Sequence, residues 1–203
     1  MLAKSWASCT IVGVGDTDSK GTLEVIHGSM LGGKTEYMIA RLRREESAGK
    51  RVLAFKHTID DRYDADHLVT HRGDRFDAVR VPDAYTILQR CADAEVVAVD
   101  EGHFFKAALI PVVNELTRRG VTVLVAGITF DSWGRPFDPM PQLAEMADEE
   151  IIRQAPCRVC GEPAPFSQRM TPIATEFMIG GADDYEPRCA DHFVPFSEPP
   201  EER

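Results

Sequence analysis

Short apolar segments alternate with longer amphipathic stretches along the first 130 residues of the chain. The apolar segments are rich in Val, Ile and Leu and cover residues 22–27, 51–56, 95–100 and 121–126. Apolar runs of this length are typical of parallel strands that are buried on both faces. Helices are predicted after Lys34, over 85–91 and over 106–119, with Gly49 and Gly120 as stop signals. The alternation predicts an α/β sheet that binds its ligands at the carboxyl ends of the strands.

The pattern changes near residue 150. Residues 151–194 are rich in Pro, Gly and Cys and show little helical periodicity, which predicts a small module after an α/β domain of residues 21–150. Residues 1–20 have no clear period and residues 195–203 are rich in Pro and Glu, so both are predicted to be tails.

The first predicted strand runs into a phosphate-binding motif. Residues 28–35 read GSMLGGKT, which matches G-x-x-x-x-G-K-[ST] between a predicted strand and a predicted helix. Glycines allow backbone N–H groups to turn towards phosphates, and the loop residues are Gly28, Ser29, Met30, Leu31, Gly32 and Gly33. We expect Lys34 to reach the β- and γ-phosphates and the Thr35 hydroxyl to bind Mg²⁺. The alternative is a glycine turn without a ligand, and the strand–helix context disfavours it.

Two carboxylates follow the third apolar run. Asp100 is a candidate partner of Mg²⁺ through water, and Glu101 is placed to act as a general base on an acceptor hydroxyl. Gly102 and His103 complete this second segment, which we expect at the nucleotide site. Acidic residues that end a strand only for solubility are the alternative, and the nearby phosphate motif makes it less favourable.

The C-terminal module contains two pairs of metal-ligand residues. Cys157 and Cys160 have two residues between them, and Cys189 and His192 follow with the same spacing after 28 residues. Three thiolates and one imidazole suit a structural Zn²⁺, and a filled tetrahedral site leaves no position for an activated water. Unpaired buried cysteines are the alternative, whereas a disulfide is disfavoured in a reducing compartment.

Composition limits the classes of partner. A chain of 203 residues with 43% hydrophobic residues can form one good-sized domain and a small appendage. The net charge of −10 disfavours nucleic acid as the main partner, but it does not disfavour a nucleotide held by a local loop. No apolar run reaches 18 residues, and no signal-peptide pattern opens the chain. We therefore expect a soluble, cytoplasmic protein with no membrane or nucleic-acid partner.

Taken in order, these motifs resemble the cellular, zinc-containing (type II) family of thymidine kinases, over residues 22–193. The resemblance depends on the series rather than on one motif. Its members are the phosphate loop, GKRVL (49–53), DDRY (60–63), DEGHFF (100–105), GRPF (134–137), GGADDY (180–185) and the two cysteine pairs.

This resemblance implies a RecA-like P-loop parallel sheet with helices on both faces and a small zinc-binding lasso domain. It implies transfer of the γ-phosphoryl group of ATP, with Mg²⁺, to the 5′-hydroxyl of thymidine, in a homotetramer inhibited by dTTP. By position, Glu101 is the base, and Arg62 is the cation that stabilises the transferring phosphoryl group beside Lys34. The thymine base would be held by the backbone of residues 171–179 and by Met30, Phe137, Ile179 and Tyr185.

The chain departs from the family pattern near the expected base pocket. His103 stands where bacterial members usually have Gln, and Ser132 stands where the family has an aromatic residue, which Phe130 or Trp133 would replace. Within the loop, Ser29 and Gly32 replace the usual Pro and Ser. One alternative is therefore a kinase with shifted or broadened base specificity. A different class, a P-loop ATPase whose zinc module binds a macromolecule, is disfavoured by the acidic balance and the absence of a Lys/Arg cluster over 150–195.

Overall fold

The computed structural model describes residues 20–60, 66–70, 72–91, 93–171 and 184–195. Within these residues the main sheet has seven strands in the order β3-β4-β2-β5-β6-β1-β7. Every pairing is parallel except that of β3 with β4. The strands are β1 (Leu23–Gly28), β2 (Val52–His57), β3 (His67–Val69), β4 (Arg75–Val81), β5 (Val96–Val99), β6 (Thr122–Ile128) and β7 (Glu149–Arg153).

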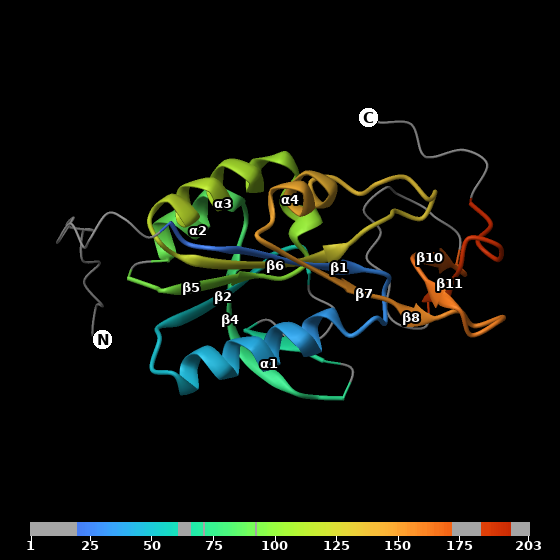
Figure 1. Ribbon diagram of the computed structural model, residues 1–203, viewed down its shortest axis with the longest axis horizontal. Coiled ribbons are helices and arrows are strands. Elements are labelled where there is room, and N and C mark those ends of the chain that lie inside the picture. Colours follow the sequence, from blue (N-terminus) through green and yellow to red (C-terminus); the bar gives the residue numbers. More distant parts are fainter. Residues whose placement is uncertain (1–19, 61–65, 71, 92, 172–183, 196–203) are drawn as a thin grey trace, which may run out of the picture.

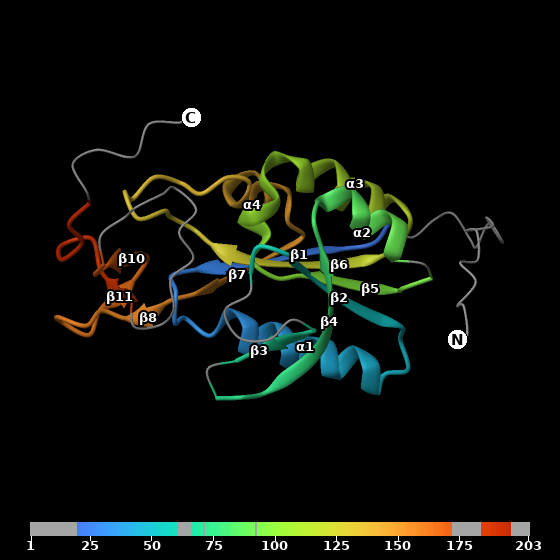
Figure 2. The ribbon, with the colours of Figure 1, turned by 180° about the vertical axis from the view of Figure 1, so that it is seen from behind.

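Helices cover both faces of this sheet (Figure 1). Helix α1 (Lys34–Ser47) lies on one face, and the view from behind places β3 beside it (Figure 2). The opposite face carries α2 (Ala84–Arg90), the 3-10 helix η1 (Gly102–Ala108), α3 (Leu109–Arg118) and α4 (Met140–Met146). This arrangement confirms the predicted α/β fold with helices on both faces.

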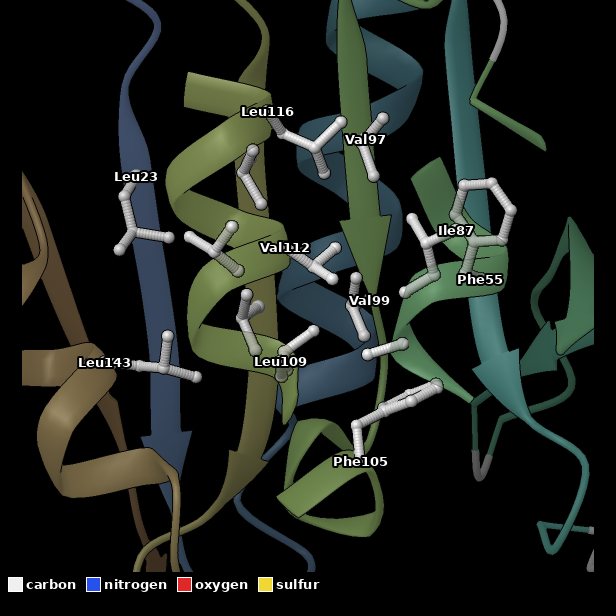
Figure 3. Packing of buried hydrophobic residues seen from close by; sticks show 14 of the residues in the cluster. Leu23, Phe55, Ile87, Val97, Val99, Phe105, Leu109, Val112, Leu116 and Leu143 are labelled. Carbon is white, nitrogen blue, oxygen red and sulfur yellow. The ribbon is translucent and has the colours of Figure 1, made fainter. Parts of the chain in front are cut away.

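The two faces bury separate hydrophobic cores. Under α3 and α2, side chains such as Leu109, Val112 and Leu116 point towards Val97 and Val99 of the sheet (Figure 3). Beneath α1, the core is built around Ile26, Met38, Ile39, Leu42 and Leu124. Because strands buried on both sides need apolar residues at consecutive positions, the four apolar runs of the sequence form the central strands. None of the helices in the described residues is both long and apolar enough to cross a membrane.

The predicted helix over 106–119 is broken near its start. Lys106 has φ 54° and ψ −160°, a non-helical conformation that kinks the chain within η1, before α3 begins at Leu109. The other two predicted helices are confirmed as α1 and α2, and Gly49 and Gly120 follow α1 and α3 with positive φ. The strands β3, β4 and β7 and the helix α4 were not predicted, because they are short or lack a clear apolar run.

A smaller unit follows the last strand of the sheet. It contains the antiparallel pairs β8 (Ala155–Pro156) with β9 (Pro163–Ala164) and β10 (Phe166–Arg169) with β11 (Tyr185–Arg188). Figure 1 shows it beside the ends of β1 and β7. Strand β7 spans the predicted division at residue 150 and pairs with β1, so it leads the chain from the sheet into this unit. The division itself stays a prediction.

An ionic network fixes α1 to β1. Arg41 donates to both carboxylate oxygens of Glu24, with Nη2–Oε1 at 2.7 Å and Nε–Oε2 at 3.2 Å. Arg41 also pairs with Glu45, whose Oε2 lies 2.6 Å from Lys50 Nζ. Hydrogen bonds from Lys50 and Arg41 lower the pKa of Glu45. The network therefore holds the helix that begins at the phosphate loop against the strand that ends there.

We expect Glu45→Gln to lower the free energy of unfolding at pH 7 by about 1–3 kcal/mol, because it removes one of the two charged partners of the half-buried Arg41 guanidinium. Since the folded-state pKa of Glu45 is lowered, its contribution is present above the unfolded-state pKa and is lost as pH falls through the folded-state value. Urea titrations at pH 7 and at about pH 3.5 measure this, with the exposed neighbour Glu46→Gln as control. An equal loss at both pH values would contradict the ionic explanation.

Candidate active site

The phosphate motif forms a loop between β1 and α1 and lies on the backbone of β7. A Cβ added to Gly28 would lie 1.8 Å from the Arg153 carbonyl oxygen, and one added to Gly32 would lie 2.3 Å from the same atom. Real Cβ atoms do not approach oxygen so closely, so in this structure the Arg153 carbonyl leaves no room for a Cβ at either position. Gly28, the first glycine of the motif, and Gly32, at one of its variable positions, therefore let the loop pack directly on the end of β7.

The residues of the motif that carry chemistry follow at the start of α1. Gly33, with φ 77°, precedes the helix, so Lys34 and Thr35 occupy its first turn. Lys34 Nζ donates to the Ser29 carbonyl at 2.7 Å, which keeps the ammonium over the loop. Free N–H groups and the macrodipole make such a helix start a favourable place for phosphate.

Thr35 meets the carboxylate predicted to organise a metal. Its Oγ1 donates to Asp100 Oδ2 at 3.3 Å, although the two residues are 65 positions apart. Hydroxyl and carboxylate oxygens are the ligand types that Mg²⁺ prefers beside phosphates. The donor set therefore fits Mg²⁺, with Thr35 and Asp100 as the residues that would hold it.

Glu101 lies in a strained turn directly after β5. Its φ of 50° and ψ of 48° are left-handed, and its N–H donates to Asp100 Oδ1 at 3.0 Å. A non-glycine residue in this region costs free energy and is common at functional sites. The loop residues Met30, Leu31, Gly33, Lys34 and Thr35 line a cavity of about 360 Å³ together with Asp100 and Glu101. The predicted base and the phosphate loop therefore share one cavity.

A buried ion pair forms another wall of this cavity and was not predicted. Lys56 at the end of β2 and Asp60 are both buried, with Nζ 3.8 Å from Oδ2. Lys56 Nζ also donates to the His67 carbonyl at 3.5 Å. The available signal was a lysine inside an otherwise apolar strand segment, because a lysine is rarely fully buried without a role.

Aromatic contacts are formed by the residues that follow Glu101, the predicted catalytic base. His103 is buried, with Nδ1 3.7 Å from Glu101 Oε2, and its ring centroid lies 4.6 Å from that of Phe137. Phe137, from the 129–137 segment, thus contacts the histidine that lies next to the predicted catalytic carboxylate. His57 packs against Phe105, with ring centroids 4.9 Å apart, and burial lowers the pKa of His57. A neutral imidazole is therefore favoured beside these rings.

Two more of the residues predicted to hold the thymine base, Met30 and Tyr185, lie in the part of the chain that the structure describes. Met30 N–H donates to Ser167 Oγ of β10 at 2.9 Å, and Tyr185 of β11 accepts from Arg169 Nη1 at 2.7 Å. The loop and the smaller unit are therefore in direct contact, and Ser167 had no sequence signal. Two further predicted residues, Arg62 and Ile179, lie outside the described residues.

Phe130 and Trp133, the aromatic residues on either side of Ser132, contact different neighbours. Phe130 contacts Phe166 at 4.8 Å between centroids, and Phe166 stacks on Phe193 at 4.5 Å. Trp133 lies under the Arg135 guanidinium at 5.0 Å. Phe130 therefore joins the 129–137 segment to the smaller unit.

The four predicted zinc ligands come together in this unit. The ligand atoms of Cys157, Cys160, Cys189 and His192 all lie within 4.8 Å of one another. Sγ of Cys160 and Sγ of Cys189 are 3.6 Å apart, close to the edge of about 3.8 Å expected for a zinc–thiolate tetrahedron. The donor set and its spacing fit Zn²⁺.

The local environment separates the pKa values of the first cysteine pair. Burial raises the pKa of Cys157, but hydrogen bonds from the backbone of Cys189, Cys160 and Val159 outweigh it and bring the pKa to about 6. For Cys160, the Glu162 backbone lowers the pKa, while burial and the neighbouring thiols raise it, and the net direction is upwards. A thiolate at Cys157 suits a metal ligand.

The parallel sheet, the phosphate loop and the strand-end carboxylates define a P-loop nucleotide-binding protein. The family model described as thymidine kinase matches residues 21–193. The chain therefore belongs to the thymidine kinase family.

Curated relatives agree with this assignment. A thymidine kinase of Rhodothermus sp. is 42% identical over 177 residues, covering 87% of this chain and 83% of the relative. One of Coprothermobacter proteolyticus is 43% identical over 85% of this chain and 90% of its own. One of Bacteroides thetaiotaomicron is 37% identical over 88% of this chain and 90% of its own. The likeness thus spans both the sheet and the smaller unit.

Proposed function

We propose that this protein transfers the γ-phosphoryl group of Mg-ATP to the 5′-hydroxyl of thymidine and forms dTMP. The observation that carries the proposal is the shared cavity, in which Glu101 faces a complete phosphate loop whose Thr35 contacts Asp100. Membership of the thymidine kinase family supports the same substrates. When bound, Mg²⁺ would neutralise charge on the phosphates, with Thr35 and Asp100 as its protein partners.

The reaction needs a base on one side of the phosphoryl group and positive charge around it. Glu101 accepts the proton of the 5′-hydroxyl as the new O–P bond forms and the bond to the β-phosphate oxygen breaks. Lys34, held over the loop by the Ser29 carbonyl, stabilises the negative charge that leaves with ADP. The family resemblance assigns a second cation, Arg62, to the transferring group.

Thymidine requires a site that excludes water from the reacting atoms. Met30, Phe137, Ile179 and Tyr185 are proposed to hold its base, and the ring contact of Phe137 with His103, next to Glu101, supports this placement for Phe137. A zinc-bound module fixes both ends of the segment between its two ligand pairs. Less conformational entropy is then lost when that segment becomes ordered around thymidine. Assembly as a homotetramer, inhibition by dTTP and a cytoplasmic location are proposed from the resemblance alone.

The test is phosphoryl transfer from Mg-ATP to thymidine, deoxyuridine, deoxycytidine, deoxyadenosine and deoxyguanosine, with ATP hydrolysis without nucleoside as control. We expect dTMP as the dominant product, with hydrolysis at least about 100-fold slower, because a kinase must exclude water from the γ-phosphate. Another monophosphate as the main product would show a redirected base pocket. Hydrolysis stimulated by nucleic acid, with no nucleoside product, would support the ATPase alternative.

A further inference from the structure

Arg153, the last residue of β7, contacts the phosphate loop with both its backbone and its side chain. Its carbonyl oxygen is the atom that excludes a Cβ at Gly28 and Gly32. Its guanidinium reaches the other end of the loop, where Nη2 lies 3.3 Å from the position that a Cβ on Gly33 would take. The Cζ atom lies 5.8 Å from the ring centroid of Tyr37, one turn into α1. The cation therefore lies alongside the first turn of the helix.

The electrostatic setting of this guanidinium is unfavourable without a ligand. Its Nε is buried and has no hydrogen-bond partner, and Arg153 forms no ion pair with any residue that the structure describes. Glu36 also borders Gly33, but its Oε1 lies 3.7 Å from Arg72 Nε. The positive end of the α1 macrodipole is at the same place, and like charges repel. A buried polar group left unpaired costs free energy as well.

Both costs disappear if an anion occupies the site. A triphosphate bound by the loop would place negative charge at the start of α1, within reach of the planar guanidinium. Arginine suits phosphate oxygens because its N–H groups form a rigid fork, and its ring contact with Tyr37 limits the conformations it must lose.

We propose that Arg153 is a further nucleotide-binding residue, which holds the polyphosphate of the nucleoside triphosphate at the end of the loop where α1 begins. The identity of that nucleotide as ATP rests on the proposed function. The contact itself depends only on the anionic polyphosphate. Arg153 thus supplies a cation from a strand 120 residues beyond Gly33 in the sequence.

Binding measured apart from catalysis tests this assignment. Isothermal titration with the non-hydrolysable Mg-AMP-PNP, and separately with inorganic tripolyphosphate, compares wild type, Arg153→Met and Arg153→Lys. We expect Arg153→Met to weaken Kd for both ligands about 5- to 30-fold and Arg153→Lys to recover part of the loss, because a charge-assisted contact is removed or retained. The difference in Kd between Arg153→Met and wild type should decrease as the salt concentration rises from about 0.05 to 0.5 M, since the contact is electrostatic.

The exposed Arg90 at the end of α2 is the matched control, because Arg90→Met removes the same charge from a distant surface. Its Kd should stay within about twofold of wild type.

A Kd of Arg153→Met equal to that of this control would overturn the proposal, and so would a loss of thymidine affinity as large as the loss of nucleotide affinity. If wild type binds Mg-AMP-PNP but does not phosphorylate thymidine, the proposed function fails while the Arg153 comparison remains decisive. If Arg153→Met does not fold, Arg153→Lys decides the question. Wild-type affinity of Arg153→Lys for tripolyphosphate supports a charge contact. A folded Arg153→Lys protein that does not bind tripolyphosphate overturns it.

Discussion

Replacing Glu101 by Gln is expected to lower kcat for thymidine phosphorylation roughly 10²- to 10⁴-fold, while thymidine and nucleotide binding change less than about threefold. Gln has the same shape and keeps a hydrogen-bond acceptor, but it cannot take a proton from the 5′-hydroxyl. The side chain is held by the left-handed turn after β5 and by the Asp100 contact to its own N–H, and neither depends on the carboxylate charge. Turnover and binding are therefore expected to separate.

Steady-state kinetics with thymidine and Mg-ATP, together with thymidine titration, measure both quantities. Glu145→Gln on the exposed surface of α4 is the matched control and should retain wild-type turnover. The wild-type kcat should rise with pH as the base ionises, and Glu101→Gln should lose this limb of the profile. Turnover near the wild-type level, or a profile with the same limb, would remove Glu101 from proton transfer.

The central fold was predictable because the signals for it are local. Each buried parallel strand is a short apolar run, and the phosphate loop combines its glycines, lysine and threonine within eight residues. The placement of Asp100 after such a run was enough to predict its approach to Thr35, because the carboxyl ends of parallel strands lie at one edge of the sheet. The zinc ligands were predictable for a similar reason, since one short spacing defines each half of the site.

Contacts between distant segments were not predictable in the same way. The support of the loop by Arg153, the hydrogen bond from Met30 to Ser167 and the ion pair of Lys56 depend on how strands pack, and none has a fixed sequence spacing. The edge strands β3 and β7 mix polar and apolar residues because one side of each faces solvent or a polar partner. Helix propensity also did not reveal the break at Lys106, which tertiary packing imposes.

Loss of the zinc site is expected to impair both substrates rather than thymidine alone. The module that carries the four ligands also holds the phosphate loop: Ser29 Oγ accepts from Ala155 N–H at 3.3 Å, and Ser167 Oγ accepts from Met30 N–H at 2.9 Å. Ser29 in turn supplies the carbonyl that positions Lys34. Disorder in the module would therefore reach Lys34, which we expect to contact the phosphates.

Cys157→Ser is the variant that tests this coupling. In small zinc domains, metal binding supplies on the order of 10 kcal/mol of folding free energy, so removal of one ligand should release the metal and disorder β8 to β11. We expect about one Zn²⁺ per chain in wild type, little in the variant, and a fall in kcat/KM of at least about 100-fold for thymidine with a clear rise in KM for Mg-ATP. Elemental analysis and kinetics measure these quantities.

The buried Cys91, at the C-terminal end of α2, provides the control, because Cys91→Ser makes the same chemical change outside the metal site. It should retain zinc and most of the activity. A Cys157→Ser protein that keeps one zinc would contradict the ligand assignment. A variant that loses zinc and thymidine binding but keeps wild-type nucleotide affinity would instead show that the sheet alone positions the loop. In that case the contacts of Ser29 and Ser167 would follow from the fold of the loop and would not support it.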